Sequence, residues 1–244
     1  MVFAQAFQDY KNNLITACAF GLLLVFVPLF SSLSNILISS GSVVVDYGFL
    51  RLPFFESFLL LFLVLVFLFL YSLLTCLLVF AVRADFNKVK LHYFLSEKVL
   101  VFAFRYFNFV AVFTLVSVLI SFFLVDLGLP VFVINIFLVL FSLPFLFLPQ
   151  AIVIDGESLR GSLLNAFEFS FKNFGSFSLV FFFGLGSVFV LQLFEFLLDY
   201  FFGVGGFISL IVALMFLVPF FEALKTEVYL SKVSLFSPYR EKLV

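Results

Sequence analysis

Long apolar stretches alternate with short polar ones along the whole chain. Six of the apolar stretches carry no charge. Their lengths are near or above the length of about 20 residues that a helix needs to cross a bilayer. They are continuously apolar and lack the alternating pattern of a membrane β-strand, which favours helices over a barrel. The pattern predicts six transmembrane helices, at residues 14–38, 57–82, 107–125, 130–154, 176–194 and 206–221.

The composition of the chain agrees with this pattern. Of its 244 residues, 65% are hydrophobic and only 11% are charged, and 45 are Phe. A soluble domain has about 25% charged residues, because polar groups must cover the surface of a globule. A water-soluble monomer is therefore excluded, and we predict a single transmembrane domain over residues 1–244.

The positive charges predict the orientation of the helices. Twelve of the thirteen Lys and Arg residues fall on one side of the predicted spans, and only Arg51 falls on the other. Lys and Arg are enriched in cytoplasmic loops, so we expect a multi-pass protein of the cell membrane with both termini in the cytoplasm.

Similar segments precede the first, third and fifth predicted spans. They read AFQDYKNNL from Ala6, AFRYFNF from Ala103 and AFEFSFKNF from Ala166. Before the fifth span, residues 155–174 have a helical apolar stripe that is expected to lie in the membrane plane or to pack under the bundle: Leu159, Leu163, Phe167, Phe171 and Phe174. We predict an all-α fold of three helical hairpins, each preceded by a short cytoplasmic amphipathic helix.

One part of this arrangement resembles a known group of proteins. The residues that carry the resemblance are Pro149 and Gln150 at a span end, the turn Asp155-Gly156-Glu157-Ser158, and the helix at 159–173. They resemble poorly characterised six-span prokaryotic membrane proteins, including the membrane domain attached to some glycerophosphodiester phosphodiesterases. The resemblance implies architecture and membrane residence. The phosphodiesterase activity does not carry over, because the chain has no separate catalytic domain.

Four polar residues are candidates for a functional position at membrane depth: Asn135, Gln150, Gln192 and Glu222. An ionisable group within a span marks a functional hypothesis, so Glu222 near Pro219 is either a coupling carboxylate beside a kink or an interface residue paired with Lys225. We favour the pairing. Asn135 and Gln192 are expected to hydrogen-bond neighbouring helices rather than to line a pore.

Two further carboxylates lie near the end of the fifth predicted span. Glu195 and Asp199, four residues apart, either attract cations at an outer opening or form the solvated end of the helix. We favour the solvated end.

The sequence has no signature of an enzyme or of a metal site. His92 is the only histidine, and the two cysteines, Cys18 and Cys76, are not spaced as metal ligands. We therefore expect no catalytic residue, no cofactor and no metal. The near-neutral net charge of −1 gives no reason to expect a nucleic-acid partner.

The remaining hypotheses concern lipids and membrane proteins. We expect a non-enzymatic scaffold or accessory protein that acts with membrane lipids or another membrane protein. The alternative is a small transporter or permease for an apolar or weakly charged solute. A transporter predicts a path lined by Asn135, Gln150, Gln192 or Glu222, whereas an accessory protein predicts a closed interior packed with phenylalanine.

Overall fold

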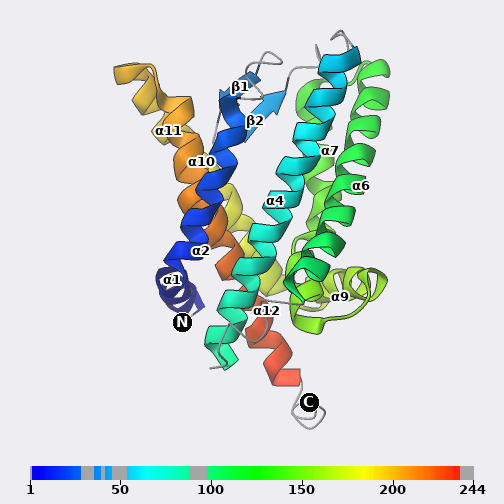
Figure 1. Cartoon of the computed structure of the whole chain (residues 1–244), viewed down its shortest axis with the longest axis vertical. Helices are drawn as coiled ribbons and strands as arrows, with labels where there is room; N and C mark the ends of the chain where they lie inside the picture. Colours follow the sequence, from blue (N-terminus) through cyan, green and yellow to red (C-terminus); the bar gives the residue numbers. More distant parts are fainter. Residues whose placement is uncertain (1, 29–35, 40–41, 46–53, 88–97, 237–244) are drawn as a thin grey trace.

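The computed structural model describes residues 2–28, 36–39, 42–45, 54–87 and 98–236. The protein is an all-α polytopic membrane protein with a short β-hairpin at one end (Figure 1). Within these described residues, five helices are long and apolar enough to cross a membrane: Phe58–Ala84, Val99–Asp126, Phe132–Asp155, Phe174–Phe202 and Gly205–Val233. A bent pair, Val2–Asn12 with Leu14–Pro28, forms a sixth if it is counted as one span.

Two of these five spans, as well as the bent pair, are built from more than one helical element. The first half of the chain contains α1 (Val2–Asn12), α2 (Leu14–Cys18), the 3₁₀ helix η1 (Ala19–Val25), β1 (Ile36–Ser39), β2 (Ser42–Val45), α4 (Phe54–Asn87) and α6 (Val99–Asp126). The second half contains α7 (Val131–Ser142), η3 (Leu143–Phe145), α8 (Leu148–Gln150), η4 (Ala151–Asp155), α9 (Leu159–Lys172), α10 (Phe174–Phe202), α11 (Gly205–Val212), η5 (Ala213–Leu217) and α12 (Val218–Phe236).

The first predicted span ends differently from the expectation. The chain bends by 79° between α1 and α2, and helix is described only to Pro28. Residues Ile36–Ser39, which include the predicted end of the span, form strand β1 and pair antiparallel with β2. The prediction of helix to residue 38 is therefore wrong at its end, where β-branched residue types favour a strand.

The three predicted units differ in how they begin. The first and third start with separate amphipathic helices, α1 and α9. In the second unit, the segment AFRYFNF lies inside the long helix α6, which starts at Val99. The prediction of a separate short helix is not met in this part of the described chain, because no helix-breaking residue interrupts 99–126.

The repeated segments nevertheless occupy similar environments. Ala6, Ala103 and Ala166 are all fully buried in one hydrophobic cluster. The phenylalanine that follows each alanine is about half exposed. The sequence similarity therefore corresponds to a shared orientation, with the alanine toward the core and the phenylalanine toward the outside.

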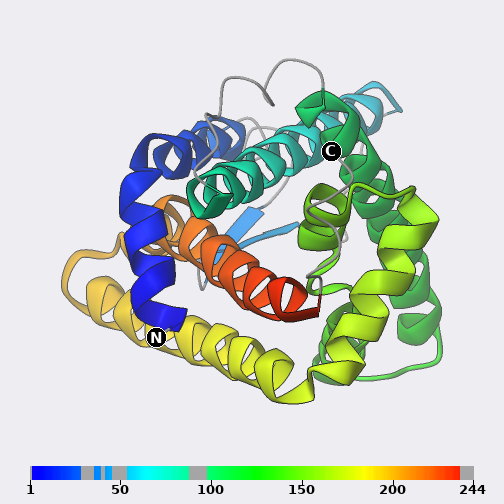
Figure 2. The same ribbon diagram turned by 90° about the horizontal axis from the view of Figure 1, so that it is seen from below.

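Helix α12 lies at the centre of the bundle. Viewed from below, α1, α4, α9 and α10 surround it (Figure 2). α1 and the end of α12 lie at the same end of the molecule, and the hairpin β1–β2 lies at the opposite end (Figure 1). The end that carries α1 also carries α9.

Helix α9 divides its predicted apolar stripe between two environments. Leu159 and Leu163 pack against the hydrophobic cluster that contains the three buried alanines. Phe167 and Phe171 are exposed, and their ring centroids are 4.6 Å apart. The helix thus packs against the bundle through one part of its stripe and presents the other part outward.

The turn between α10 and α11 is held by the two carboxylates near the end of the fifth span. Glu195 is buried and accepts a hydrogen bond from the Ser209 hydroxyl at 2.9 Å. Asp199 accepts a bond from the main-chain N–H of Gly205 at 2.6 Å. The interpretation of Glu195 as a solvated residue is therefore wrong, because α11 folds back over it.

Some sequence features lie outside the described residues. These are His92 and Arg51.

Candidate functional site

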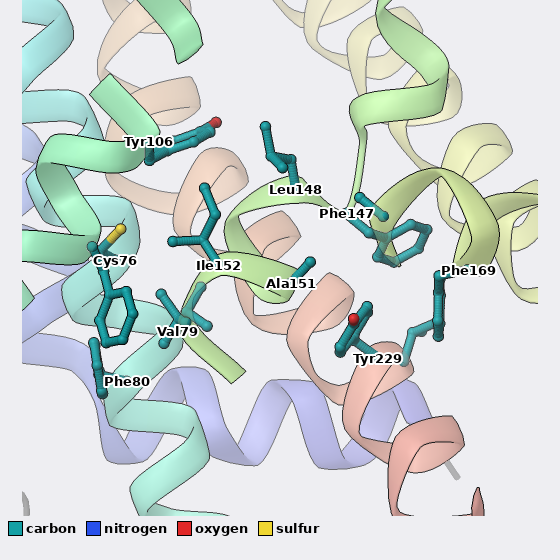
Figure 3. Packing of buried hydrophobic residues seen from close by; sticks show 14 of the residues in the cluster. Cys76, Val79, Phe80, Tyr106, Phe147, Leu148, Ala151, Ile152, Phe169 and Tyr229 are labelled. Carbon is teal, nitrogen blue, oxygen red and sulfur yellow. The ribbon is translucent and has the colours of Figure 1, made fainter. Parts of the chain in front are cut away.

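The fourth span is interrupted where it enters the centre of the bundle. After α7 come the 3₁₀ turn η3, the short helix α8 and the π-helical segment η4. Pro144 and Pro149 lie in this region, and a proline removes a main-chain donor and breaks α-helical bonding. Figure 3 shows Leu148, Ala151 and Ile152 between Cys76 and Tyr106 on one side and Phe169 and Tyr229 on the other.

The sixth span is also irregular. The π-helical segment η5 separates α11 from α12, and Pro219 follows it. Pro219 has no N–H for the carbonyl of Met215, which would be its partner in an α-helix. The Tyr10 hydroxyl of α1 donates to this carbonyl at 3.2 Å. The short helix α1 therefore supplies a donor that the proline lacks.

A buried polar cluster joins these two irregular spans. Gln150, Glu222 and Lys225 are 0%, 3% and 4% exposed. The Gln150 amide donates to Glu222 Oε2 at 3.1 Å, and Lys225 Nζ donates to Glu222 Oε1 at 2.7 Å. Gln150 also contacts the Thr226 hydroxyl at 3.5 Å. Buried charges are retained where they are paired and hydrogen-bonded in this way.

Lys225 makes two further contacts that fix its ammonium group. It donates to the main-chain carbonyl of Leu146, beside the break in the fourth span, at 3.2 Å. It also lies 5.3 Å from the ring centroid of Phe221, within the range of a cation–π interaction. The lysine thus connects α12 to the interrupted segment.

A cavity of about 640 Å³ lies next to this cluster. Its walls come from α4, α6, the end of α7 with η3, α10, η5 and α12. Val188 of α10 lines the cavity and is 51% exposed, so the cavity reaches the outer surface of the bundle beside this residue. Its volume lies within the range of about 300–1,000 Å³ that is usual for small-molecule sites.

The polar groups of the cavity gather at one end. Tyr71, Tyr106, Glu222 and Lys225 line this end, next to Leu146. The Ser142 and Ser187 hydroxyls farther along donate to carbonyls of their own helices. The remaining lining is apolar and rich in phenylalanine: Phe109, Val110, Phe113, Phe145, Leu146, Gly184, Val188, Leu191, Ala213, Leu217, Val218 and Phe221.

The structure brings together two of the four predicted site residues. Gln150 and Glu222 are hydrogen-bonded, and the expected pairing of Glu222 with Lys225 is present. Asn135 and Gln192 are exposed on α7 and α10, so neither lies between two helices of this chain as expected.

Sequence analysis missed most of the cavity end. Lys225 was predicted only as a partner of Glu222, and Tyr71 and Tyr106 were not predicted, although all three line the cavity. The sequence feature that could have identified these residues is the presence of polar side chains within or beside the predicted spans, including Tyr71 in the second span. Their convergence depends on the tertiary packing of three helices, α4, α6 and α12.

The donor set does not suggest a metal site. Among the described residues, no group of three or more His, Cys, Asp or Glu side chains could hold a metal ion. The ammonium of Lys225 already supplies the positive charge next to Glu222.

Comparison with protein-family models, curated proteins and solved structures gave no match.

Proposed function

We propose that this protein is a non-enzymatic accessory protein of the cell membrane that binds a membrane amphiphile in its central cavity. The observation that carries the proposal is the cavity lining, which is apolar along most of its length and polar at one end. An amphiphile has the same distribution of groups. Both ends of the chain are placed in the cytoplasm in this proposal, as the distribution of Lys and Arg indicates.

The size and direction of the cavity support this ligand class. Its lining on the last span runs from Ala213 to Lys225, which corresponds to roughly 18 Å along a helix at about 1.5 Å per residue. This length is sufficient for a long hydrocarbon chain. The half-exposed Val188 marks a side through which a chain in the surrounding bilayer can enter.

A transporter remains the second candidate because of one specific observation. The two spans that the buried polar cluster joins both contain breaks in regular α-helix, and interrupted helices often line the substrate sites of transporters. However, Asn135 and Gln192 are exposed on the outside of the bundle. Of the four residues predicted to line a transport path, only Glu222 lines the cavity.

The proposal is tested by asking whether an amphiphile enters the cavity. The protein in nanodiscs is exposed to hexadecanol or hexadecyl sulfate, each with a photoactivatable diazirine on the chain, and the crosslinked residues are mapped by mass spectrometry. We expect crosslinks at lining residues such as Phe113 and Leu217 with at least one of the probes. Ser187→Phe places a ring in the cavity and should lower these crosslinks at least fivefold.

Gly186→Phe is the matched control. Gly186 is adjacent and exposed on α10, and a Cβ added there meets no atom of another helix within 4 Å, so the new ring points away from the bundle. Cavity crosslinks should be unchanged in this variant. Crosslinks confined to the outer surface with both probes, or equal loss in both variants, would contradict the proposal.

A further inference from the structure

We propose that the amphiphile has an uncharged polar head, such as a hydroxyl or carbonyl group, that hydrogen-bonds at the Lys225 end of the cavity. This inference rests on the proposed function and specifies the ligand class of the same site. It follows from the balance of charge and of hydrogen-bond donors around Glu222 and Lys225.

The charges that line the cavity already neutralise each other. The Glu222 carboxylate and the Lys225 ammonium are 2.7 Å apart and nearly fully buried, and they are the charged groups among the described residues of the cavity lining. A charged head entering the cavity would therefore lack a counter-charge of its own. A buried charge without a partner is strongly disfavoured inside a membrane protein, so the lining selects against anions and cations alike.

The same end of the cavity offers hydrogen-bonding capacity to a neutral head. A lysine ammonium has three N–H donors. Among the described residues, two acceptors are found for Lys225, namely Glu222 Oε1 and the carbonyl of Leu146. Tyr71 and Tyr106, whose hydroxyls are hydrogen-bonded to each other, line the same region. A hydroxyl or carbonyl oxygen is the group that uses an N–H or phenolic donor without adding charge.

Nearby groups hold the ion pair in its present arrangement. Glu222 Oε2 accepts from Gln150, while the Gln150 Oε1 atom has no partner among the described residues. The amide is therefore oriented with its donor toward the carboxylate, which can only accept when ionised. This contact keeps the Glu222 carboxylate in place as the counter-ion of Lys225. The ammonium therefore does not favour an anionic head group.

The inference is tested with three competitors that share a sixteen-carbon chain. Unlabelled hexadecanol, hexadecyl sulfate and hexadecyltrimethylammonium compete against the crosslinking of a diazirine probe in the cavity of the wild-type protein. We expect hexadecanol to compete at a concentration at least tenfold lower than either charged compound. Equal competition by all three would overturn the uncharged head while leaving amphiphile binding, and so the proposed function, intact.

Charge variants provide a second and independent measurement. Glu222→Gln leaves the lysine without its carboxylate, so the preference should shift at least tenfold toward hexadecyl sulfate. Lys225→Gln should shift it toward hexadecyltrimethylammonium by a similar factor. The double variant E222Q/K225Q contains no buried charge at these positions and should prefer hexadecanol again.

The wild-type competition keeps the test decisive if a single variant fails to fold. Preferences that stay the same in folded Glu222→Gln and folded Lys225→Gln would overturn the role of the ion pair. Absence of cavity crosslinks with every probe would instead contradict the proposed function itself.

Discussion

At the scale of single residues, the contact between Tyr10 and Met215 illustrates how a proline in a span is accommodated. Pro219 leaves the Met215 carbonyl without its α-helical donor, and the Tyr10 hydroxyl occupies that role. We expect Tyr10→Phe to lower the free energy of unfolding by about 1 kcal/mol, the usual contribution of one hydrogen bond. Titration with SDS in mixed micelles measures this change.

A double-mutant cycle separates this hydrogen bond from general packing. Pro219→Ala restores an N–H near the Met215 carbonyl, so Tyr10→Phe should cost less than half as much in that background. Tyr200→Phe, on the exposed end of α10, serves as the control and should have little effect. Equal effects of Tyr10→Phe in both backgrounds would show that the hydroxyl does not compensate for the proline.

Residue-level reasoning from sequence was most successful where partners are close along the chain. The pairing of Glu222 with Lys225 was predicted because three residues separate them on one helix. Gln150 is 72 residues from Glu222, and their contact depends on how the fourth and sixth spans pack. Glu195 was misjudged for a related reason, since only the fold of α11 over α10 buries it.

At the scale of elements, the hairpin of α10 and α11 depends on the close approach at Gly205. A Cβ on Gly205 would meet the main-chain oxygen of Glu195 and the carboxylate of Asp199, and both are fixed by the turn. Gly205→Ala should therefore lower the free energy of unfolding by about 1–3 kcal/mol, as overpacking generally does. SDS titration of the purified protein measures the loss.

Gly186→Ala is the matched control for this prediction. Gly186 lies in the middle of α10 with no atom within 4 Å of an added Cβ. Alanine favours a helix over glycine by about 0.5–1 kcal/mol, so this variant should be neutral or slightly stabilising. Equal destabilisation by the two substitutions would mean that loss of glycine flexibility, and not the close approach at the turn, is responsible.

Element boundaries were predicted less well than the number and type of elements. Uninterrupted apolar stretches identified the long helices, because the bilayer requires them. The same stretches gave no indication of the breaks within the fourth and sixth spans beyond their prolines. Residues of those breaks, Phe145, Leu146, Ala213 and Leu217, line the cavity beside residues of regular helices. Part of the cavity wall therefore depends on departures from regular helix that apolarity alone does not encode.

At the scale of the whole molecule, the positive-inside prediction assigns the end that carries α1 and α9 to the cytoplasm. Lys11 and Lys172 are exposed at this end, while Asp126 and Tyr200 are exposed near the turns at the opposite end (Figure 1). Single cysteines at these four positions report the orientation in a Cys18→Ser background. Cys76 is kept, because it is fully buried and should not react.

The expected labelling follows directly from the arrangement of the helices. In right-side-out vesicles, a membrane-impermeant thiol reagent should label the cysteines at 126 and 200 and spare those at 11 and 172; in inverted vesicles the pattern should reverse. The opposite pattern would place the polar end of the cavity nearer the external leaflet. Labelling of both ends from one side would contradict the orientation of the bundle across the bilayer. With the expected pattern, the ion pair lies toward the cytoplasmic leaflet, so an amphiphile bound with its head at Lys225 has the orientation of a lipid in that leaflet.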